Sequence, residues 1–286
     1  MLPTIAAKGE TLGSVTAAAR HAEELGFESI WAIYQRVAGT GAPLLDSLTA
    51  LTAAAAVTER VKLGVGVLIL PLRPVVWVAK QVATLQHISG DRVLLGVGVG
   101  GDRHDLSWAA AGVSKRDRGR LTDEALRLLP DLIGGKPARL PTGAEVQLSP
   151  AATVPPIIVG GMSDAAARRV TEYGDGWYVI SSPEDLPGQL AQLRGKTVEI
   201  TANAMVAIEG DRSLPDRDTM LRSVSDPDGM FGFPPEHAEA AVLRGDPSVI
   251  AERVARLHAG GAERVVVTFV AGDWFRQTEL LAEALR

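Results

Sequence analysis

The sequence contains no cysteine, which excludes disulfides, a thiolate nucleophile and thiolate metal ligands. It also lacks an excess of positive charge: the formal net charge is −5, which argues against a nucleic-acid-binding protein. No apolar run is long enough to span a bilayer as a helix, since the run at 61–72 is broken by Lys62 and by glycines. The first ten residues, MLPTIAAKGE, do not resemble a signal peptide. We therefore expect a soluble cytoplasmic protein with no membrane or nucleic-acid partner.

Two kinds of segment alternate along the 286 residues, of which 46% are hydrophobic. Short β-branched segments predict strands, and because they are apolar throughout they suit a parallel sheet covered on both faces. These segments lie at 29–34, 61–70, 92–99, 156–159, 176–181, 198–208 and 263–270, with a short first strand at 2–6. Longer segments between them have helical spacing, as in Val78, Val82 and Leu85 or Ile250, Val254 and Leu257.

Eight strands with helices between them predict one α/β domain over residues 1–286, a (β/α)8 TIM barrel with inserted loops. A doubly wound open sheet is the alternative, because periodicity alone does not separate the two. Residues 134–155 and 209–245 do not fit the repeat and are interpreted as an excursion and an inserted loop with a short helix. The aromatic residues near 226–235 form either a lid over a pocket or a surface loop held by its aromatics.

Glycines at three predicted strand ends are candidate ligand contacts. Gly160 and Gly161 end one strand, and Ser163 follows as a helix cap, so free backbone N–H groups there suit an anion such as a phosphate. The alternative is an ordinary tight turn. Residues 96–101 match G-x-G-x-x-G, but no helix follows directly, so we interpret them as a strand end that a flat ring approaches. Gly64 and Gly66 indicate a bulge near a ligand or packing against bulky neighbours.

His104 follows the fourth predicted strand, on the face where barrels carry their active sites, and is the histidine most suited to function. No motif of a metal hydrolase, an NTPase or an α/β-hydrolase is present, so no metal site is expected.

Taken together, these segments resemble the luciferase-like monooxygenase family, whose members use FMN or the deazaflavin coenzyme F420. The resemblance covers nearly the whole chain in order. Its stretches are 22–31 (AEELGFESIW), 58–67 (TERVKLGVGV), 72–74 (LRP), 83–98 (ATLQHISGDRVLLGVG), 118–126 (RGRLTDEAL), 159–161 (VGG), 174–177 (GDGW), 245–247 (GDP) and 260–262 (GGA).

The resemblance implies a cofactor site at matching positions. The Gly66–Val67 bond corresponds to the non-proline cis peptide that backs the ring of the flavin. Gly98, Val99 and Gly100 would line the ring or its side chain. The phosphate would be held by the backbone of four consecutive residues: Gly160, Gly161, Met162 and Ser163.

The chain departs from the family where acid–base residues are common. Tyr34 and Gln35 stand where many deazaflavin enzymes have an acidic residue and a histidine, and Gly101 stands where several have a glutamate. A general acid must reach the reacting atom, which leaves His104, Tyr34 and Asp102 as candidates, with Gln35 beside them.

Three hypotheses follow. The first is an F420-dependent oxidoreductase that moves hydride between the coenzyme and a small organic substrate. The second is an FMN-dependent monooxygenase that receives reduced flavin from a partner reductase. The third is a barrel without catalysis that serves as a binding or partner subunit. A homodimer is expected from the family, with the alanine-rich helix at 44–57 as a candidate contact.

Overall fold

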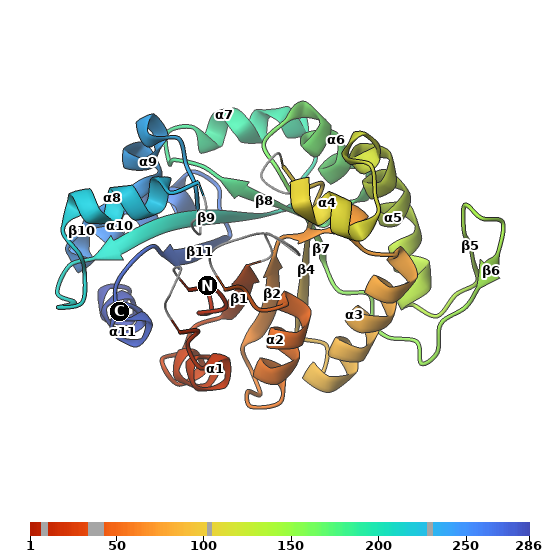
Figure 1. Ribbon diagram of the computed structural model, residues 1–286, viewed down its shortest axis with the longest axis horizontal. Helices are drawn as coiled ribbons and strands as arrows, with labels where there is room; N and C mark the ends of the chain where they lie inside the picture. The colour runs from red at the N-terminus through yellow and green to blue at the C-terminus, as the bar shows by residue number, and fades with distance from the viewer. Residues whose placement is uncertain (7–10, 34–42, 102–104, 228–230) are drawn as a thin grey trace.

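A mostly parallel sheet curls through the protein until it nearly closes into a barrel (Figure 1). The computed structural model describes residues 1–6, 11–33, 43–101, 105–227 and 231–286. Among the described residues, the main strands pair in parallel in the order β1 (Ser29–Ile33), β2 (Lys62–Gly66), β4 (Val93–Gly98), β7 (Ile157–Gly160), β8 (Gly176–Ile180), β9 (Glu199–Ile208) and β11 (Arg264–Phe269). The predicted barrel is thus confirmed, and the open sheet is not observed.

Helices alternate with these strands and cover the outside of the sheet (Figure 1). They are α1 (Val15–Glu24), α2 (Ser47–Ala55), α3 (Val75–Ser89), α4 (Asp105–Ala111), α5 (Arg118–Ile133), α6 (Asp164–Tyr173), α7 (Leu186–Leu190), α8 (Arg217–Ser225), α9 (Pro235–Ala241), α10 (Pro247–Ala259) and α11 (Trp274–Ala284). In the described residues, short 3-10 turns occupy Leu70–Leu72, Lys115–Asp117 and Ala191–Leu193. Within the described parts of the chain, no helix is long and apolar enough to cross a membrane.

The helix faces predicted from spacing are the buried ones. In α3, Val78 and Val82 are fully buried, and in α10, Ile250 and Leu257 are as well. Side chains cap several helices: Asp46 accepts from the backbone of Thr49 at the start of α2, as Asp246 and Asp273 do for α10 and α11. Burial of one apolar stripe per helix is therefore what attaches the outer layer to the sheet.

Three regions differ from the sequence expectations. Residues 2–6 form no strand beside the barrel; the described part contains only an isolated antiparallel bridge between Ile5 and Leu44. The excursion at 134–155 contains a two-stranded hairpin, β5 (Ala138–Arg139) with β6 (Glu145–Val146). The region 209–245 is more ordered than a loop with one short helix, because it contains α8, α9 and the strand β10 (Val242–Gly245), which pairs with the end of β9.

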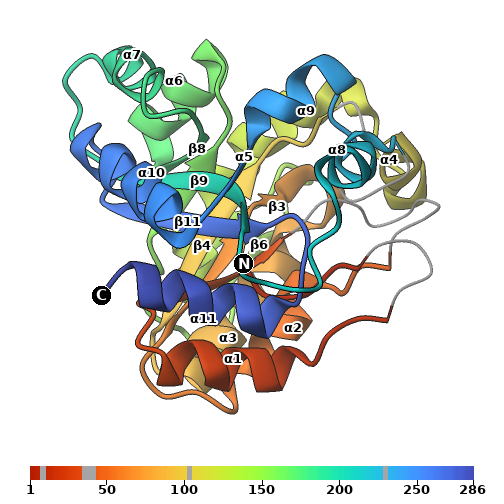
Figure 2. The ribbon, with the colours of Figure 1, turned by 90° about the vertical axis from the view of Figure 1, so that its left-hand side faces the viewer.

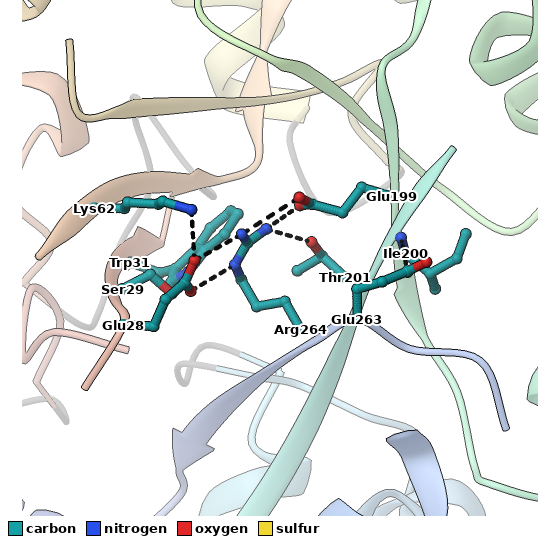
Figure 3. Close-up of polar contacts among 9 residues, drawn as sticks. All are labelled: Glu28, Ser29, Trp31, Lys62, Glu199, Ile200, Thr201, Glu263 and Arg264. Carbon is teal, nitrogen blue, oxygen red and sulfur yellow. Dashed lines mark hydrogen bonds and ion pairs between the residues drawn. The ribbon is translucent and has the colours of Figure 1, made fainter. Parts of the chain in front are cut away.

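Charged side chains tie the amino-terminal ends of the strands together. Arg264, almost fully buried at the start of β11, donates to both carboxylate oxygens of Glu28 at 2.8 and 2.9 Å and also pairs with Glu199 (Figure 3). Lys62 Nζ lies 2.8 Å from Glu28 Oε1. The Arg264 guanidinium beside Glu28 lowers the pKa of that carboxyl to about 2. This cluster links β1, β2, β9 and β11 at the end of the barrel that usually serves stability rather than catalysis.

Candidate active site

The Gly66–Val67 peptide interrupts a strand at the carboxyl end of the barrel. β2 pairs Gly64 with Leu94, and its continuation β3 (Leu68–Ile69) pairs Leu68 with Val97. Four residues on this strand therefore face three on β4, which is a bulge of one extra residue. The Gly66–Val67 bond within the bulge is cis, as the resemblance predicted. The bulge places half-buried Gly66 and Val67 at the mouth of the barrel.

Glycines on the two neighbouring strands make room for the Val67 side chain. A Cβ at Gly98 would lie 2.8 Å from Val67 Cγ2, and one at Gly160 would lie 3.0 Å from both methyl groups. Both glycines are buried. Their assignment to direct cofactor contact stays a prediction, and the structure adds a packing role for both glycines around Val67. The Val67 side chain is thus held between Gly98 at the end of β4 and Gly160 at the end of β7, and we call this surface the valine shelf.

Gly64 has a different role from Gly66. A Cβ at Gly64 would lie 2.2 to 2.4 Å from atoms of the Trp31 indole, which is fully buried inside the barrel. The packing alternative is thus the correct one for Gly64. Gly100, with φ at +75°, is half-buried beside Val99, and a Cβ there would lie 2.8 Å from Ile69 Cγ2. Gly100 thus lets the chain turn sharply where β4 ends.

The turn after β7 leads directly into α6. Gly161 has φ at +126°, its carbonyl accepts a hydrogen bond from Trp177 Nε1 at 2.7 Å, and Ser163 Oγ accepts from Ala166 N at 3.3 Å. Gly161, Met162 and Ser163 are exposed. The first N–H groups of a helix lack acceptors within the helix, so this fixed and open turn can bind an anion. The four residues predicted to hold a phosphate therefore lie together, next to the valine shelf.

A buried polar network lies beneath the shelf, and sequence reasoning missed it. Asn203 Nδ2 lies within donor distance of Tyr178 Oη (3.0 Å), Thr268 Oγ1 (2.9 Å) and the Val266 carbonyl (3.2 Å). A Cβ at Gly66 would be 3.2 Å from Tyr178 Oη, so this hydroxyl lies directly against the bulge. Burial raises the pKa of Tyr178, which keeps the phenol protonated at neutral pH. The only sequence signal was a polar residue in each of three apolar strands.

The proposed acid–base residues directly follow β1 and β4 in the sequence. His104, Tyr34 and Gln35 fall outside the described residues, as does Asp102, so their roles remain predictions. They border described strand ends: Gln35 and Tyr34 follow β1, and His104 follows β4. In the parallel sheet these ends meet at the mouth of the barrel.

The aromatic residues of the inserted region serve an internal packing role. Phe231 is buried in a small cluster with Met205, Met220 and Val242, and its ring stacks on Phe233 at 6.3 Å between centroids. Met230 lies outside the described residues. The structure therefore favours the loop held by its aromatics over an apolar lid at this point.

The residues at the mouth fit a flat ring with an anionic tail. A half-buried apolar surface is formed by Val67 and Val99, and side chains of the chain itself pack closely against the neighbouring Gly66 and Gly100. The open helix start of α6 lies on the adjoining strand end. An apolar platform beside backbone N–H donors is the donor set that such a group requires.

Comparisons with known proteins give the family and the fold of the chain. Residues 2–209 match the sequence profile of the family described as luciferase-like monooxygenase. Uncharacterised mycobacterial proteins, such as one of Mycobacterium tuberculosis, are 34% identical over 160 residues, which is 54% of each chain. The chain thus spans about half the length of these curated relatives.

Two characterised relatives match over a longer stretch. An F420-dependent glucose-6-phosphate dehydrogenase of Beutenbergia cavernae is 31% identical over 77% of this chain and 64% of its own. A 4-hydroxyprotoasukamycin monooxygenase of Streptomyces nodosus subsp. asukaensis is 27% identical over 81% and 69%.

Solved structures share the fold. An F420-dependent secondary alcohol dehydrogenase bound to an F420–acetone adduct superposes with a TM-score of 0.72 at 19% identity, over 95% of this chain and 94% of that one. The oxygenating component of a Pseudomonas putida 3,6-diketocamphane monooxygenase in complex with FMN gives 0.68 at 15%, over 95% and 91%. Because the family profile covers more than half of the sequence, the chain belongs to the luciferase-like monooxygenase family.

Proposed function

We propose that the protein is an F420-dependent oxidoreductase that transfers hydride between the deazaflavin coenzyme and a small organic substrate. The observation that carries the cofactor site is the valine shelf next to the open start of α6, on adjoining strand ends, and it suits a flavin or a deazaflavin. The family membership supports an oxidoreductase or monooxygenase, and the F420-dependent relative and structural neighbour favour the deazaflavin.

The chain's own residues would bind and orient the coenzyme. Gly66 and Val67 would support one face of the ring, while Gly98, Val99 and Gly100 would border it. The backbone N–H groups at 161–163, following Gly160, would hold the phosphate at the positive end of the α6 dipole. A bound deazaflavin supplies the hydride chemistry. His104, Tyr34 and Gln35 are the residues proposed to hold or move a proton at the substrate.

An FMN-dependent monooxygenase supplied by a partner reductase is the second candidate. The match to the 4-hydroxyprotoasukamycin monooxygenase over 81% of this chain favours it. Both candidates use the same shelf and the same anion site, so they differ in the cofactor and not in the fold.

Equilibrium titration of the purified protein with F420 and with FMN tests the proposal. We expect F420 to bind at least tenfold more tightly, with a change in its absorbance band. A Gly161→Val variant should lose most of this affinity, because a β-branched side chain does not adopt φ of +126° readily. Gly188→Ala is the matched control, since a Cβ there meets nothing within 4 Å. Binding of FMN alone supports the second candidate, and binding of neither supports the non-catalytic barrel.

The proposal also covers the domain organisation, the location and the oligomeric state of the protein. Residues 1–286 would form a single barrel domain that acts in the cytoplasm as a homodimer. Most of α2 packs against its own chain, with Leu48, Leu51 and Ala54 buried, so only its outer side remains for a partner subunit. Light scattering of the purified protein would test the dimer.

A further inference from the structure

A buried amide on β9 contacts two hydroxyl groups inside the barrel. β8, β9 and β11 lie side by side (Figure 2), and each contributes one polar side chain: Tyr178, Asn203 and Thr268. These three residues are 6%, 6% and 3% exposed. Asn203 Nδ2 lies 3.0 Å from Tyr178 Oη and 2.9 Å from Thr268 Oγ1. One amide nitrogen therefore serves both hydroxyls.

The Val266 carbonyl fixes which end of the Asn203 amide faces the hydroxyls. It lies 3.2 Å from Asn203 Nδ2, and because a carbonyl oxygen only accepts, the amide nitrogen and not the amide oxygen must lie there. The Tyr178 hydroxyl is then an acceptor toward Asn203, and its own hydrogen points away from the amide. Burial raises the pKa of Tyr178, so the phenol keeps that hydrogen at neutral pH. In the described part of the chain, no residue accepts it.

The Tyr178 hydroxyl also meets β2, which lies elsewhere in the barrel wall. β4 and β7 separate β2 from β8 in the sheet, so this contact crosses the interior of the barrel. A Cβ at Gly66 would lie 3.2 Å from Tyr178 Oη. Its other nearest atoms would be Met1 Cε at 3.0 Å and Trp31 Cε3 at 3.4 Å, both of which are carbon. The hydroxyl is thus the polar group among the three side chains that pack against Gly66.

The bulge at Gly66 and Val67 is therefore held on two sides. The Val67 methyl groups pack against the backbone of Gly98 and Gly160, as the close approach to a Cβ at either position shows. Gly66 packs on the Tyr178 hydroxyl, which Asn203 holds in turn.

The second hydroxyl of the network does not share this contact. Thr268 bonds to the same Asn203 amide, but it is not among the three nearest neighbours of a Cβ at Gly66. Two hydroxyls on one amide thus differ in whether they reach the bulge.

We propose that Tyr178 is a positioning residue for the valine shelf, and that Asn203 holds its hydroxyl against Gly66. The position of Gly66 sets that of Val67, the next residue on the strand. Removal of the hydroxyl should then loosen the bulge in the protein without ligand. It should also weaken binding of the cofactor ring, a consequence that rests on the proposed function.

The test compares Tyr178→Phe with Thr268→Val as the matched control. Each change removes one acceptor from Asn203 Nδ2 and keeps most of the side-chain volume, so both variants lose one buried hydrogen bond. Amide hydrogen exchange over residues 66–69 is measured in the ligand-free proteins, relative to exchange in α10. We expect Tyr178→Phe to speed it at least tenfold and Thr268→Val to leave it within twofold. The affinity for F420 should likewise fall at least tenfold in Tyr178→Phe and stay within twofold in Thr268→Val.

Equal exchange over 66–69 in the two variants would overturn the proposal, because the network would then serve the fold alone. Unchanged F420 affinity in Tyr178→Phe, with binding by the wild type, would overturn it as well. If the exchange differs as expected and the wild type binds neither F420 nor FMN, the proposed function fails while the positioning of the bulge stands.

Asn203→Leu covers the case in which Tyr178→Phe does not fold. This variant keeps the Tyr178 hydroxyl but removes the amide that holds it, so we expect the same loosening over 66–69. Exchange there at the wild-type rate would contradict the role of Asn203 and overturn the proposal.

Discussion

Replacement of Arg264 with methionine should weaken the protein in a pH-dependent way. The side chain of Arg264 is only 9% exposed, and methionine fills similar space without charge. The change removes both hydrogen bonds to Glu28 and the pairing with Glu199. A fall in the pKa of Glu28 from 4.5 to about 2 corresponds to about 3 kcal/mol at 1.36 kcal/mol for each pKa unit.

Solvent screening reduces that value, because the Glu28 side chain is 50% exposed. Removal of the buried Arg264 charge also removes its desolvation penalty, which offsets part of the remaining loss of stability. We therefore expect a loss of about 1 to 2 kcal/mol at pH 7, seen as a fall of a few degrees in the thermal midpoint. A carboxyl whose pKa is lower in the folded state stabilises the protein at pH values above its unfolded-state pKa. This stabilisation is lost as the pH falls through the folded-state pKa. The difference from the wild type should thus be complete above pH 4.5 and shrink as the pH falls toward 2.

Urea titrations at pH 7, 4 and 3 measure this directly. Lys62→Met is the control, because Lys62 also pairs with Glu28 but is 46% exposed, and we expect a loss under about 0.5 kcal/mol. Equal losses in the two variants, or a loss for Arg264→Met that is the same at pH 7 and pH 3, would refute the reasoning.

Three further predictions concern the shelf, the buried network and the amino terminus. Gly160→Ala should lower the free energy of unfolding by about 1 to 3 kcal/mol and weaken cofactor binding about tenfold, because its Cβ meets both methyl groups of Val67 at 3.0 Å. Urea titration against Gly188→Ala measures the loss of stability, and equal stability of the two variants would contradict the prediction. Tyr178→Phe should lower the free energy of unfolding by about 1 to 3 kcal/mol, since Asn203 loses an acceptor in a buried site. An unchanged free energy of unfolding would show that the hydroxyl does not stabilise the fold. Burial lowers the pKa of the Met1 amino group from 8.0 to about 5. Unfolding then takes up a proton between pH 5 and 8, so stability should rise with pH over that window, by about 1 to 2 kcal/mol after screening of the half-buried residue; an acetylated amino terminus should show no such slope.

Local sequence patterns predicted most of the fold. Apolar segments predicted the strands, and the helical spacing of Val78, Val82 and Leu85 predicted a helix whose buried face the structure shows. Such predictions succeed because the pattern of apolar residues along one element is a local property of the sequence. The glycines at 64 and 66 indicated either a bulge near a ligand or packing against bulky neighbours. The register of β2 and β3 against β4 shows a bulge, and Gly64 packs against Trp31.

Features that depend on pairing between distant segments were not predictable in this way. Tyr178, Asn203 and Thr268 come together only because β8, β9 and β11 are neighbours in the sheet. The packing of Gly98 and Gly160 around Val67 likewise depends on register, which spacing alone does not show. In place of the strand expected at 2–6, the amino group of Met1 donates to the Val267 carbonyl and Leu2 N donates to the Trp31 carbonyl.

We propose that the mouth of this barrel binds a deazaflavin through the valine shelf and the start of α6. Isothermal titration of the purified protein with F420 tests it most directly, with FMN as the competing ligand. We expect one F420 to bind per chain, at least tenfold more tightly than FMN, and we expect the affinity to be lost in Gly161→Val and kept in Gly188→Ala. Absence of binding by both cofactors at high micromolar concentration, or F420 binding that Gly161→Val leaves unchanged, would contradict it.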